Sequence, residues 1–233
     1  MSRAAIPLRA DTMTVERGLY DVFLRLPIVS FTLFFFVREM SALRGMIATR
    51  LYVSDYGQLF FAVAARISVM MFLALLAALH LTRLRPVRKY GTWGPRITAL
   101  LGLLTVYALV MVPRAESVAW GDGLSAMLLL GGNTLGMLAV LDLGRSLSIM
   151  PEARQLVTTG CYRRVRHPLY LAEDIELLGI FLQFRSGPAA IVLTAHVLVQ
   201  LRRMDWEEDI LLRVFPEYAD YRRRSCRLVP GLY

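Results

Sequence analysis

The stretch TTGCYRRVRHPLYLAEDIELLGIFLQF, residues 158–184, decides how this chain is organised. It begins as a basic, turn-forming loop and becomes an apolar helix that carries carboxylates. Its centre is RHPLY, residues 166–170, where a proline suits the first turn of a helix. Charged and polar groups are costly where a chain enters hydrocarbon. We therefore expect this junction to hold a ligand and the rest of the chain to support it.

The composition places the chain in a membrane. It has 233 residues, 56% of them hydrophobic, and a mean hydropathy of +0.50. The net charge of +9 comes almost wholly from arginine, since Lys89 is the only lysine, and the arginines cluster between apolar runs. This distribution is typical of a positive-inside membrane topology. A nucleic-acid partner is not expected, because no soluble fold with a basic face is visible.

Six apolar runs predict an all-α, polytopic integral membrane helical bundle of about 5–6 spans. Arg25 and Pro27 interrupt the first run, which is either a kinked span or an interfacial helix, and residues 40–57 are expected at headgroup level. In the run that holds Arg66, we expect this side chain to reach for the nearer interface. The runs are residues 22–37, 59–82, 97–112, 124–143, 169–184 and 188–201.

The last two runs are short, and Arg185-Ser186-Gly187 joins them as a tight helical hairpin. Glycines in the fourth run are expected to allow close helix packing. A C-terminal amphipathic helix, DWEEDILLRVF, should then lie in the cytoplasm with the arginine-rich loops 83–96 and 144–168. We expect one folded unit with N-terminal spans at 1–143 and a catalytic region at 144–233.

Two polar clusters are candidates for chemistry. In the first, Tyr170, Glu173, Asp174 and Leu177 share a helix face, and Glu176 lies on a neighbouring strip. Carboxylates inside an apolar hairpin must pair with arginines, hold a cationic ligand or be protonated. Pairing with Arg163, Arg164 or Arg203 is the plain alternative to a functional role.

The second cluster is Arg203 with Glu207 and Glu208. Arg203 and Glu207 are four residues apart, so an ordinary helical ion pair is the plain explanation. However, the hairpin is so short that this segment and residues 166–170 must emerge at the same membrane face. We expect the two clusters to be neighbours.

No metal site is predicted. Cys161 and Cys226 form no CxxC pair, and no histidines stand at ligand spacing. His80 and His196 lie alone on apolar helices, where a hydrogen-bonding role is the simpler interpretation.

Two separated motifs give the chain a family resemblance. The run LGRSLSIMPEARQLVTTGCYRRVRHPLYL and, after the hairpin, RMDWEEDILLRVFPEYADYRRRSCRLVPGLY resemble the isoprenylcysteine carboxyl methyltransferase and phospholipid methyltransferase family of integral membrane enzymes. The resemblance covers roughly the last ninety residues. It implies S-adenosylmethionine as cofactor, S-adenosylhomocysteine as product, and a lipophilic substrate that enters from the bilayer.

The resemblance also implies roles for single residues. Arg166, His167, Pro168 and Tyr170 would shape the cofactor pocket, and Glu207 and Glu208 would meet the cofactor's ammonium or ribose hydroxyls. Arg203 matches a family arginine that faces the substrate. A carboxylate acceptor needs no base, whereas an amine acceptor would make Glu173 or Glu207 a base. The chain departs from the family pattern at Ala172, usually glycine, and at Cys161, usually proline, and the Ala172 methyl would narrow the approach of the cofactor.

Several alternatives stay open. Isoprenylcysteine-type carboxyl O-methylation stands first, with phospholipid amine N-methylation and small-thiol S-methylation beside it. Membrane sterol or steroid reductases share a similar RHPxY segment followed by an acidic residue, which Glu173 matches, and would use NADPH. A non-catalytic membrane scaffold is the third class.

Overall fold

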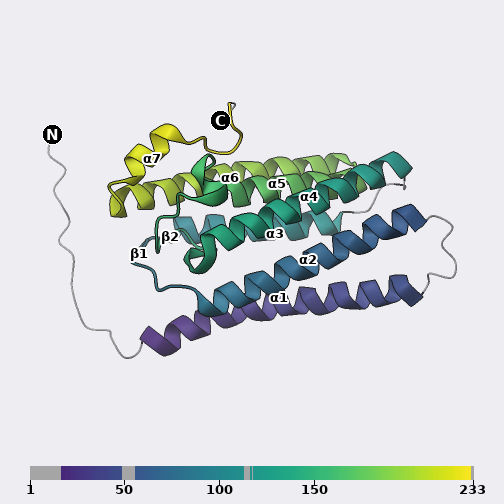
Figure 1. The fold of residues 1–233 in the computed structure, drawn as a ribbon, viewed down its shortest axis with the longest axis horizontal. Coiled ribbons are helices and arrows are strands. Elements are labelled where there is room, and N and C mark those ends of the chain that lie inside the picture. Colours follow the sequence, from purple (N-terminus) through teal and green to yellow (C-terminus); the bar gives the residue numbers. More distant parts are fainter. Residues whose placement is uncertain (1–16, 49–55, 113–115, 117, 232–233) are drawn as a thin grey trace.

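The computed structural model describes residues 17–48, 56–112, 116 and 118–231, which form an elongated bundle of roughly parallel helix axes (Figure 1). Both polar clusters and the arginine-rich loops lie at one end of this bundle. The elements are α1 (Arg17–Ala48), α2 (Tyr56–Thr82), β1 (Arg88–Lys89), α3 (Gly94–Met111), α4 (Ala119–Leu143), η2 (Gly144–Ser146), β2 (Glu152–Ala153), η3 (Gly160–Arg163), α5 (Pro168–Phe184), α6 (Gly187–Val214) and α7 (Tyr218–Arg224).

Three described helices are long and apolar enough to cross a membrane: Arg25–Ala48 in α1, Leu59–Thr82 in α2, and Trp120–Ser146 at α4. The expected count of about 5–6 spans would also require α3, α5 and α6. Of these, α3 is apolar over the shorter range Gly94–Val106.

Helix α1 is longer than the first predicted segment. It is one continuous helix of 32 residues that keeps Pro27 inside it and extends to Ala48, so the headgroup-level segment expected from residue 40 is helical up to that point. Residues 49–55 lie outside the described part. Arg66 of α2 pairs with Glu39 of α1 at 2.6 Å, a partner that the sequence did not predict. This ion pair offsets the cost of placing a charged side chain among the apolar residues of each helix.

The predicted hairpin is present, and its turn is very short. Helix α5 ends at Phe184 and α6 begins at Gly187. Arg185 adopts a left-handed conformation at φ 36°, and the Ser186 hydroxyl accepts a hydrogen bond from the amide of Ala189 at 3.3 Å. The polar segment expected as a separate C-terminal helix instead continues α6 without a break to Val214. The hairpin therefore carries Arg203, Glu207 and Glu208 back to the end where α5 begins.

Helices α4 and α5 approach each other closely through small residues, as expected for packing in lipid. A Cβ atom at Gly132 would lie 3.0 Å from the carbonyl oxygen of Ala172 and 3.1 Å from the amide nitrogen of Glu176. A Cβ atom at Gly179 would lie 3.1 Å from the carbonyl oxygen of Ser125. This contact fixes the start of α5.

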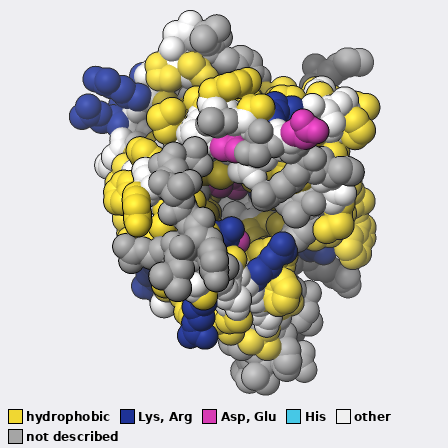
Figure 2. All heavy atoms as spheres, turned by 90° about the vertical axis from the view of Figure 1, so that its right-hand side faces the viewer, with side chains coloured by type: hydrophobic (Ala, Val, Ile, Leu, Met, Phe, Trp, Pro, Cys, Tyr) yellow, Lys and Arg dark blue, Asp and Glu magenta, His cyan; other side chains and the backbone are white. Residues whose placement is uncertain are grey.

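The two arginine-rich loops are joined by a small antiparallel sheet, which the all-α prediction did not include. Strand β1 pairs with β2 in the register Arg88↔Ala153 and Lys89↔Glu152. The opposite end of the bundle is seen in Figure 2, where hydrophobic side chains cover much of the flanks and charged side chains of both signs stand among them.

Candidate active site

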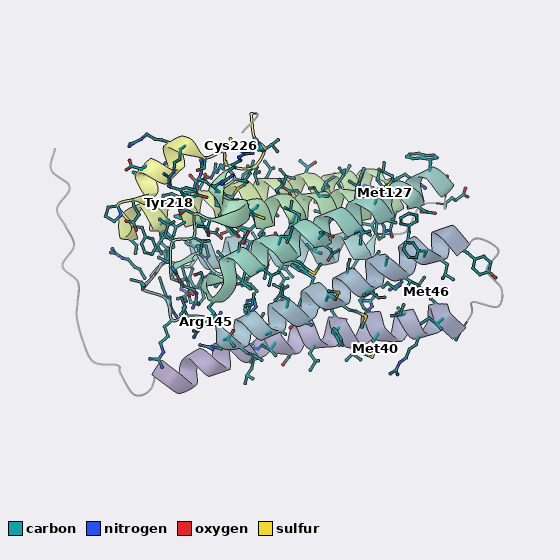
Figure 3. The ribbon with its side chains drawn as sticks, viewed as in Figure 1. Met40, Met46, Met127, Arg145, Tyr218 and Cys226 are labelled. Carbon is teal, nitrogen blue, oxygen red and sulfur yellow. The ribbon has the colours of Figure 1, made fainter. Side chains whose placement is uncertain are left out.

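The junction at residues 164–168 is held from outside by the tail that follows α7. His167 is the N-cap residue of α5, and Pro168 occupies its first turn. Val165 forms a parallel bridge with Cys226, through hydrogen bonds from the amide of Arg166 to the carbonyl of Cys226 and from the amide of Cys226 to the carbonyl of Arg164, both 2.8 Å. Figure 3 shows Tyr218 and Cys226 at this end of the bundle. The tail therefore acts as a strap across the start of α5.

Tyr170 and Glu207 connect the two helices of the hairpin. The Tyr170 hydroxyl donates a hydrogen bond to Oε1 of Glu207. The His167 ring stacks against the Tyr170 ring with centroids 5.5 Å apart, and its Nδ1 lies 3.8 Å from Oε2 of Glu207. The two polar clusters are thus one site, as the short hairpin predicted.

Glu208 lies beside this pair but has different surroundings. It is only 4% exposed, and three arginines and one histidine surround its carboxylate. Arg166 Nε donates to it at 2.9 Å, His167 Nε2 lies at 3.2 Å, and Arg222 and Arg227 each approach to 3.3 Å. Burial alone would raise the pKa of Glu208, but hydrogen bonds from His167 and Arg166 and the positive charge of Arg166 lower it to about 2. This carboxylate ties α6 to the junction and to the strap.

Arg203 does not form the helical ion pair with Glu207 that was its plain explanation. Its guanidinium lies over the Tyr170 ring, 4.8 Å from the centroid, and donates a long hydrogen bond of 3.5 Å to the carbonyl of Ile149. The residue is 7% exposed, and its Nε has no hydrogen-bond partner. A Cβ atom at Gly102 would lie 3.0 Å from Nη1 of Arg203, so the glycine leaves room for the guanidinium. A buried guanidinium with an unused donor is suited to an anionic group.

Glu173 is the start of a polar chain that enters the bundle. Gln200 Nε2 donates to Glu173 at 2.9 Å and to His196 Nε2 at 2.9 Å. His196 Nδ1 lies 2.7 Å from the Thr105 hydroxyl, which donates to the carbonyl of Gly102 at 2.8 Å. This order of donors and acceptors assigns the His196 proton to Nδ1. His196 therefore has the hydrogen-bonding role expected for it.

Among the described residues, the other carboxylates of α5 form none of the arginine pairs that were the plain alternative to a functional role. Asp174 has a buried Oδ1 without a hydrogen-bond partner, and Glu176 packs beside Gly132 of α4. Arg163 and Arg164 are exposed and form no ion pair with any α5 carboxylate. The short loop directs these two side chains to water, whereas the carboxylates point into the helix contact.

The Ala172 methyl group packs against α4. Its Cβ lies 3.6 Å from the Cβ position that Gly136 would have, so it faces α4, on the side of α5 away from Tyr170. Sequence reasoning also missed Arg222 and Arg227 as partners of Glu208. The only signal for them was the surplus of arginine in the tail RRRSCR, where no spacing distinguishes one from another.

Known proteins resemble parts of this chain. Two curated relatives are metal-resistance proteins by name. The nickel-cobalt-cadmium resistance protein of Alcaligenes xylosoxydans xylosoxydans is 37% identical over 82 residues, covering 35% of this chain and 38% of the relative. The cobalt-zinc-cadmium resistance protein of Cupriavidus metallidurans is 34% identical over 151 residues, covering 62% of this chain and 64% of the relative. Both matches thus span less than two thirds of those relatives.

The family comparison covers the hairpin and the helix before it. Residues 122–218 match the family described as phospholipid methyltransferase, from the first turns of α4 to the start of α7. The match includes Tyr170, Arg203, Glu207 and Glu208. Residues 122–218 are thus similar to the isoprenylcysteine and phospholipid methyltransferase family of membrane proteins.

Proposed function

We propose that this chain is an S-adenosylmethionine-dependent membrane methyltransferase that O-methylates a carboxylate on a lipophilic substrate of the isoprenylcysteine type. The observation that carries the proposal is the hydrogen bond from Tyr170 to Glu207, with Arg203 on the Tyr170 ring. It joins the two motifs of the family match around one buried guanidinium. Residues 144–233 supply every group of this site except the end of the polar chain on α3.

The residues present fit the cofactor. Glu207 keeps Oε2 for a hydroxyl or ammonium group, and the stacked His167 and Tyr170 rings give a flat surface beside it. Carboxylates and aromatic faces are the groups that bind cationic ligands. When bound, S-adenosylmethionine supplies an electrophilic methyl group on a sulfonium. Glu208 is already paired with arginines. We therefore propose that it stabilises the site and does not contact the cofactor.

Arg203 favours a carboxylate as the acceptor. A guanidinium binds a carboxylate through two parallel hydrogen bonds and so fixes its direction. A carboxylate attacks without losing a proton, so the chain needs to supply orientation and exclusion of water. An amine acceptor would need a base, and the Glu173 carboxylate is engaged by Gln200. We therefore assign Arg203 to the substrate and Glu173 to the support of Gln200 and Arg203.

We further propose that the site faces the cytoplasm. The two arginine-rich loops join in one sheet beside the site, and the basic tail covers it. Positive charge is retained on the cytoplasmic side during insertion. In this orientation the cofactor arrives from water while the lipophilic substrate arrives through the bilayer.

The test is methyl transfer by the purified full chain in nanodiscs. Labelled S-adenosylmethionine is supplied with a prenylcysteine analogue, a phospholipid with an amine headgroup, or a hydrophobic thiol. Label in the prenylcysteine ester supports the proposal, and label only in the amine or the thiol overturns the carboxylate assignment. In parallel, calorimetry compares S-adenosylhomocysteine with NADPH. Binding of NADPH alone overturns the methyltransferase assignment in favour of a reductase.

Glu207→Gln tests the site itself, and Glu217→Gln is the matched control. Glu217 is exposed and makes no side-chain capping bond at α7. We expect Glu207→Gln to weaken S-adenosylhomocysteine binding by about tenfold, the effect of losing one hydrogen bond to a charged group, and Glu217→Gln to leave it unchanged. If both variants bind S-adenosylhomocysteine equally well, Glu207 does not take part in cofactor binding.

A further inference from the structure

Helix α3 contributes a residue to the candidate active site from outside the part of the chain that matches the family. Gly102 is buried, and a Cβ atom there would lie 3.0 Å from Nη1, 3.3 Å from Cδ and 3.6 Å from Cζ of Arg203. The side chain of Arg203 therefore lies directly against the backbone of α3 at this glycine. The matched residues 122–218 include Arg203 but not Gly102.

The contact at Gly102 differs from the close contacts between α4 and α5. At Gly132 and Gly179 the nearest atoms include backbone atoms of the neighbouring helix, so these glycines let two helices approach each other. At Gly102, the three nearest atoms among the described residues beyond the local backbone all belong to the side chain of Arg203. Glycine weakens the interior of a helix, and the space that it leaves here is filled by one charged side chain.

The strip of α3 that carries Gly102 is fixed against α6. Gly102 is buried, whereas the residues directly before and after it are exposed, so α3 turns a narrow strip toward α6. One turn further along, the Thr105 hydroxyl donates to the carbonyl of Gly102 at 2.8 Å and lies 2.7 Å from Nδ1 of His196. Because this hydrogen bond joins α3 to α6, it keeps Gly102 in register with Arg203.

Helix α5 and the loop before it also limit the position of the guanidinium. Cζ of Arg203 lies 4.8 Å from the centroid of the Tyr170 ring, and Nη2 lies 3.5 Å from the carbonyl of Ile149. A methyl group at position 102 would displace the guanidinium by a few tenths of an ångström within these limits. A carboxylate that is bound through two parallel hydrogen bonds takes its direction from the guanidinium plane. Displacement of Arg203 would therefore change the direction of a bound carboxylate.

We propose that Gly102 is a positioning residue for Arg203, and that α3 thereby forms part of the place where the methyl acceptor binds. Gly102 contacts the guanidinium and not the reacting atoms. The proposal rests on the proposed function, because it concerns how Arg203 directs the acceptor carboxylate. A change at Gly102 should act on the acceptor and leave the cofactor groups at His167 and Glu207 in place.

The test is a double-mutant cycle of G102A and R203K in the purified full chain in nanodiscs. Lysine lacks Nη1, the atom nearest to Gly102, so the added methyl group should be tolerated better in the R203K background. The matched control is G94A in the same helix, where a Cβ atom would make an ordinary contact of 3.6 Å with Trp206. The measurements are methyl transfer to a prenylcysteine analogue, S-adenosylhomocysteine binding and thermal unfolding.

We expect G102A to lower kcat/KM for the prenylcysteine analogue by about tenfold in the natural chain and by less than about twofold in R203K. The affinity for S-adenosylhomocysteine should change by less than about twofold. G102A should also lower the unfolding midpoint more in the natural chain than in R203K, which measures the contact without using activity. G94A should leave all three measurements unchanged in either background.

Equal losses of kcat/KM from G102A in the two backgrounds would overturn the positioning role, because the methyl group would then act at another place. A loss of S-adenosylhomocysteine affinity equal to the loss of kcat/KM would assign Gly102 to general support of the site instead. If the natural chain transfers no label to the prenylcysteine analogue, the proposed carboxylate acceptor fails and the role of Gly102 in placing it fails too. Unequal shifts of the unfolding midpoint would show in that case that the contact with Arg203 exists without this role.

Discussion

Tyr170 of α5 donates its hydroxyl hydrogen bond to Glu207 of α6, which is 37 positions further along the chain. This bond joins the open ends of the hairpin, while the two-residue connection at Arg185 and Ser186 joins the closed end. The polar site is therefore built on two helices that are fixed at both ends. Such support favours a site that is preorganised before the ligand binds.

Tyr170→Phe tests this bond while it keeps the ring under Arg203. The carboxylate of Glu207 then loses a donor in a largely buried place, which costs about 1–3 kcal/mol. We expect S-adenosylhomocysteine to bind about tenfold more weakly, measured by calorimetry in detergent. Tyr56→Phe, at an exposed tyrosine at the start of α2, is the control. Unchanged binding by Tyr170→Phe would show that the bond does not position Glu207.

Arg203→Lys keeps the positive charge but removes the planar guanidinium. Lysine cannot bind a carboxylate through two parallel bonds, so we expect turnover to fall by about tenfold or more while the affinity for S-adenosylhomocysteine changes by less than about twofold. Arg202→Lys is the control, since Arg202 is exposed and stacks on Trp206. Loss of cofactor affinity equal to the loss of turnover would assign Arg203 to the cofactor instead.

Glu208 predicts a pH dependence of stability. Its pKa is about 2 in the folded chain against an ordinary value of 4.5, so the folded state binds fewer protons than the unfolded state. The stabilisation is present above pH 4.5 and is lost as the pH falls through about 2. The difference corresponds to roughly 3 kcal/mol. We expect the free energy of unfolding to decline between pH 4.5 and 2, and Glu208→Gln to be less stable at pH 7 with a flatter decline.

The measurement is unfolding in detergent, followed by intrinsic fluorescence across this pH range. Glu217→Gln serves again as the exposed control and should keep the native profile. If Glu208→Gln keeps the native slope, the three arginines around the carboxylate do not act as its counter-charges.

Gly132→Ala tests the contact between α4 and α5. The added methyl group would lie 3.0–3.1 Å from backbone atoms of Ala172 and Glu176. Because these are backbone atoms, one of the two helices must move to relieve the close contact. We expect a loss of about 1–3 kcal/mol in the free energy of unfolding. Gly131→Ala is a matched control in the same helix, because nothing lies within 4 Å of its Cβ position. It should be neutral or slightly stabilising, since alanine is the better helix former.

The sequence predicted the hairpin and the meeting of its two polar clusters because both follow from local rules. Helix spacing sets the faces of α5 and α6, and a short connection between apolar runs leaves no other arrangement for their ends. The spans of α2 and α4 were visible for the same reason, because each is a long run of apolar residues.

What the sequence did not reveal depends on partners that lie far apart in the chain. Glu39 and Arg66 each interrupt an apolar run, and only the packing of α1 on α2 shows that they compensate each other. Likewise, only the positions of α7 and the tail show that Arg222 and Arg227 contact Glu208. The packing of Ala172 on α4 was also not predicted, because a departure from a family pattern does not say which side of the helix the residue occupies.

The strap at Cys226 and Arg227 has a consequence for the order in which the protein matures. It follows α1 to α6 in the chain, yet it supplies the bonds that hold residues 164–167 and the arginine that meets Glu208. In the order of the chain, helices α1 to α6 therefore precede the residues that close the junction at His167. During synthesis, the hairpin exists before the contacts that fix the start of α5 can form.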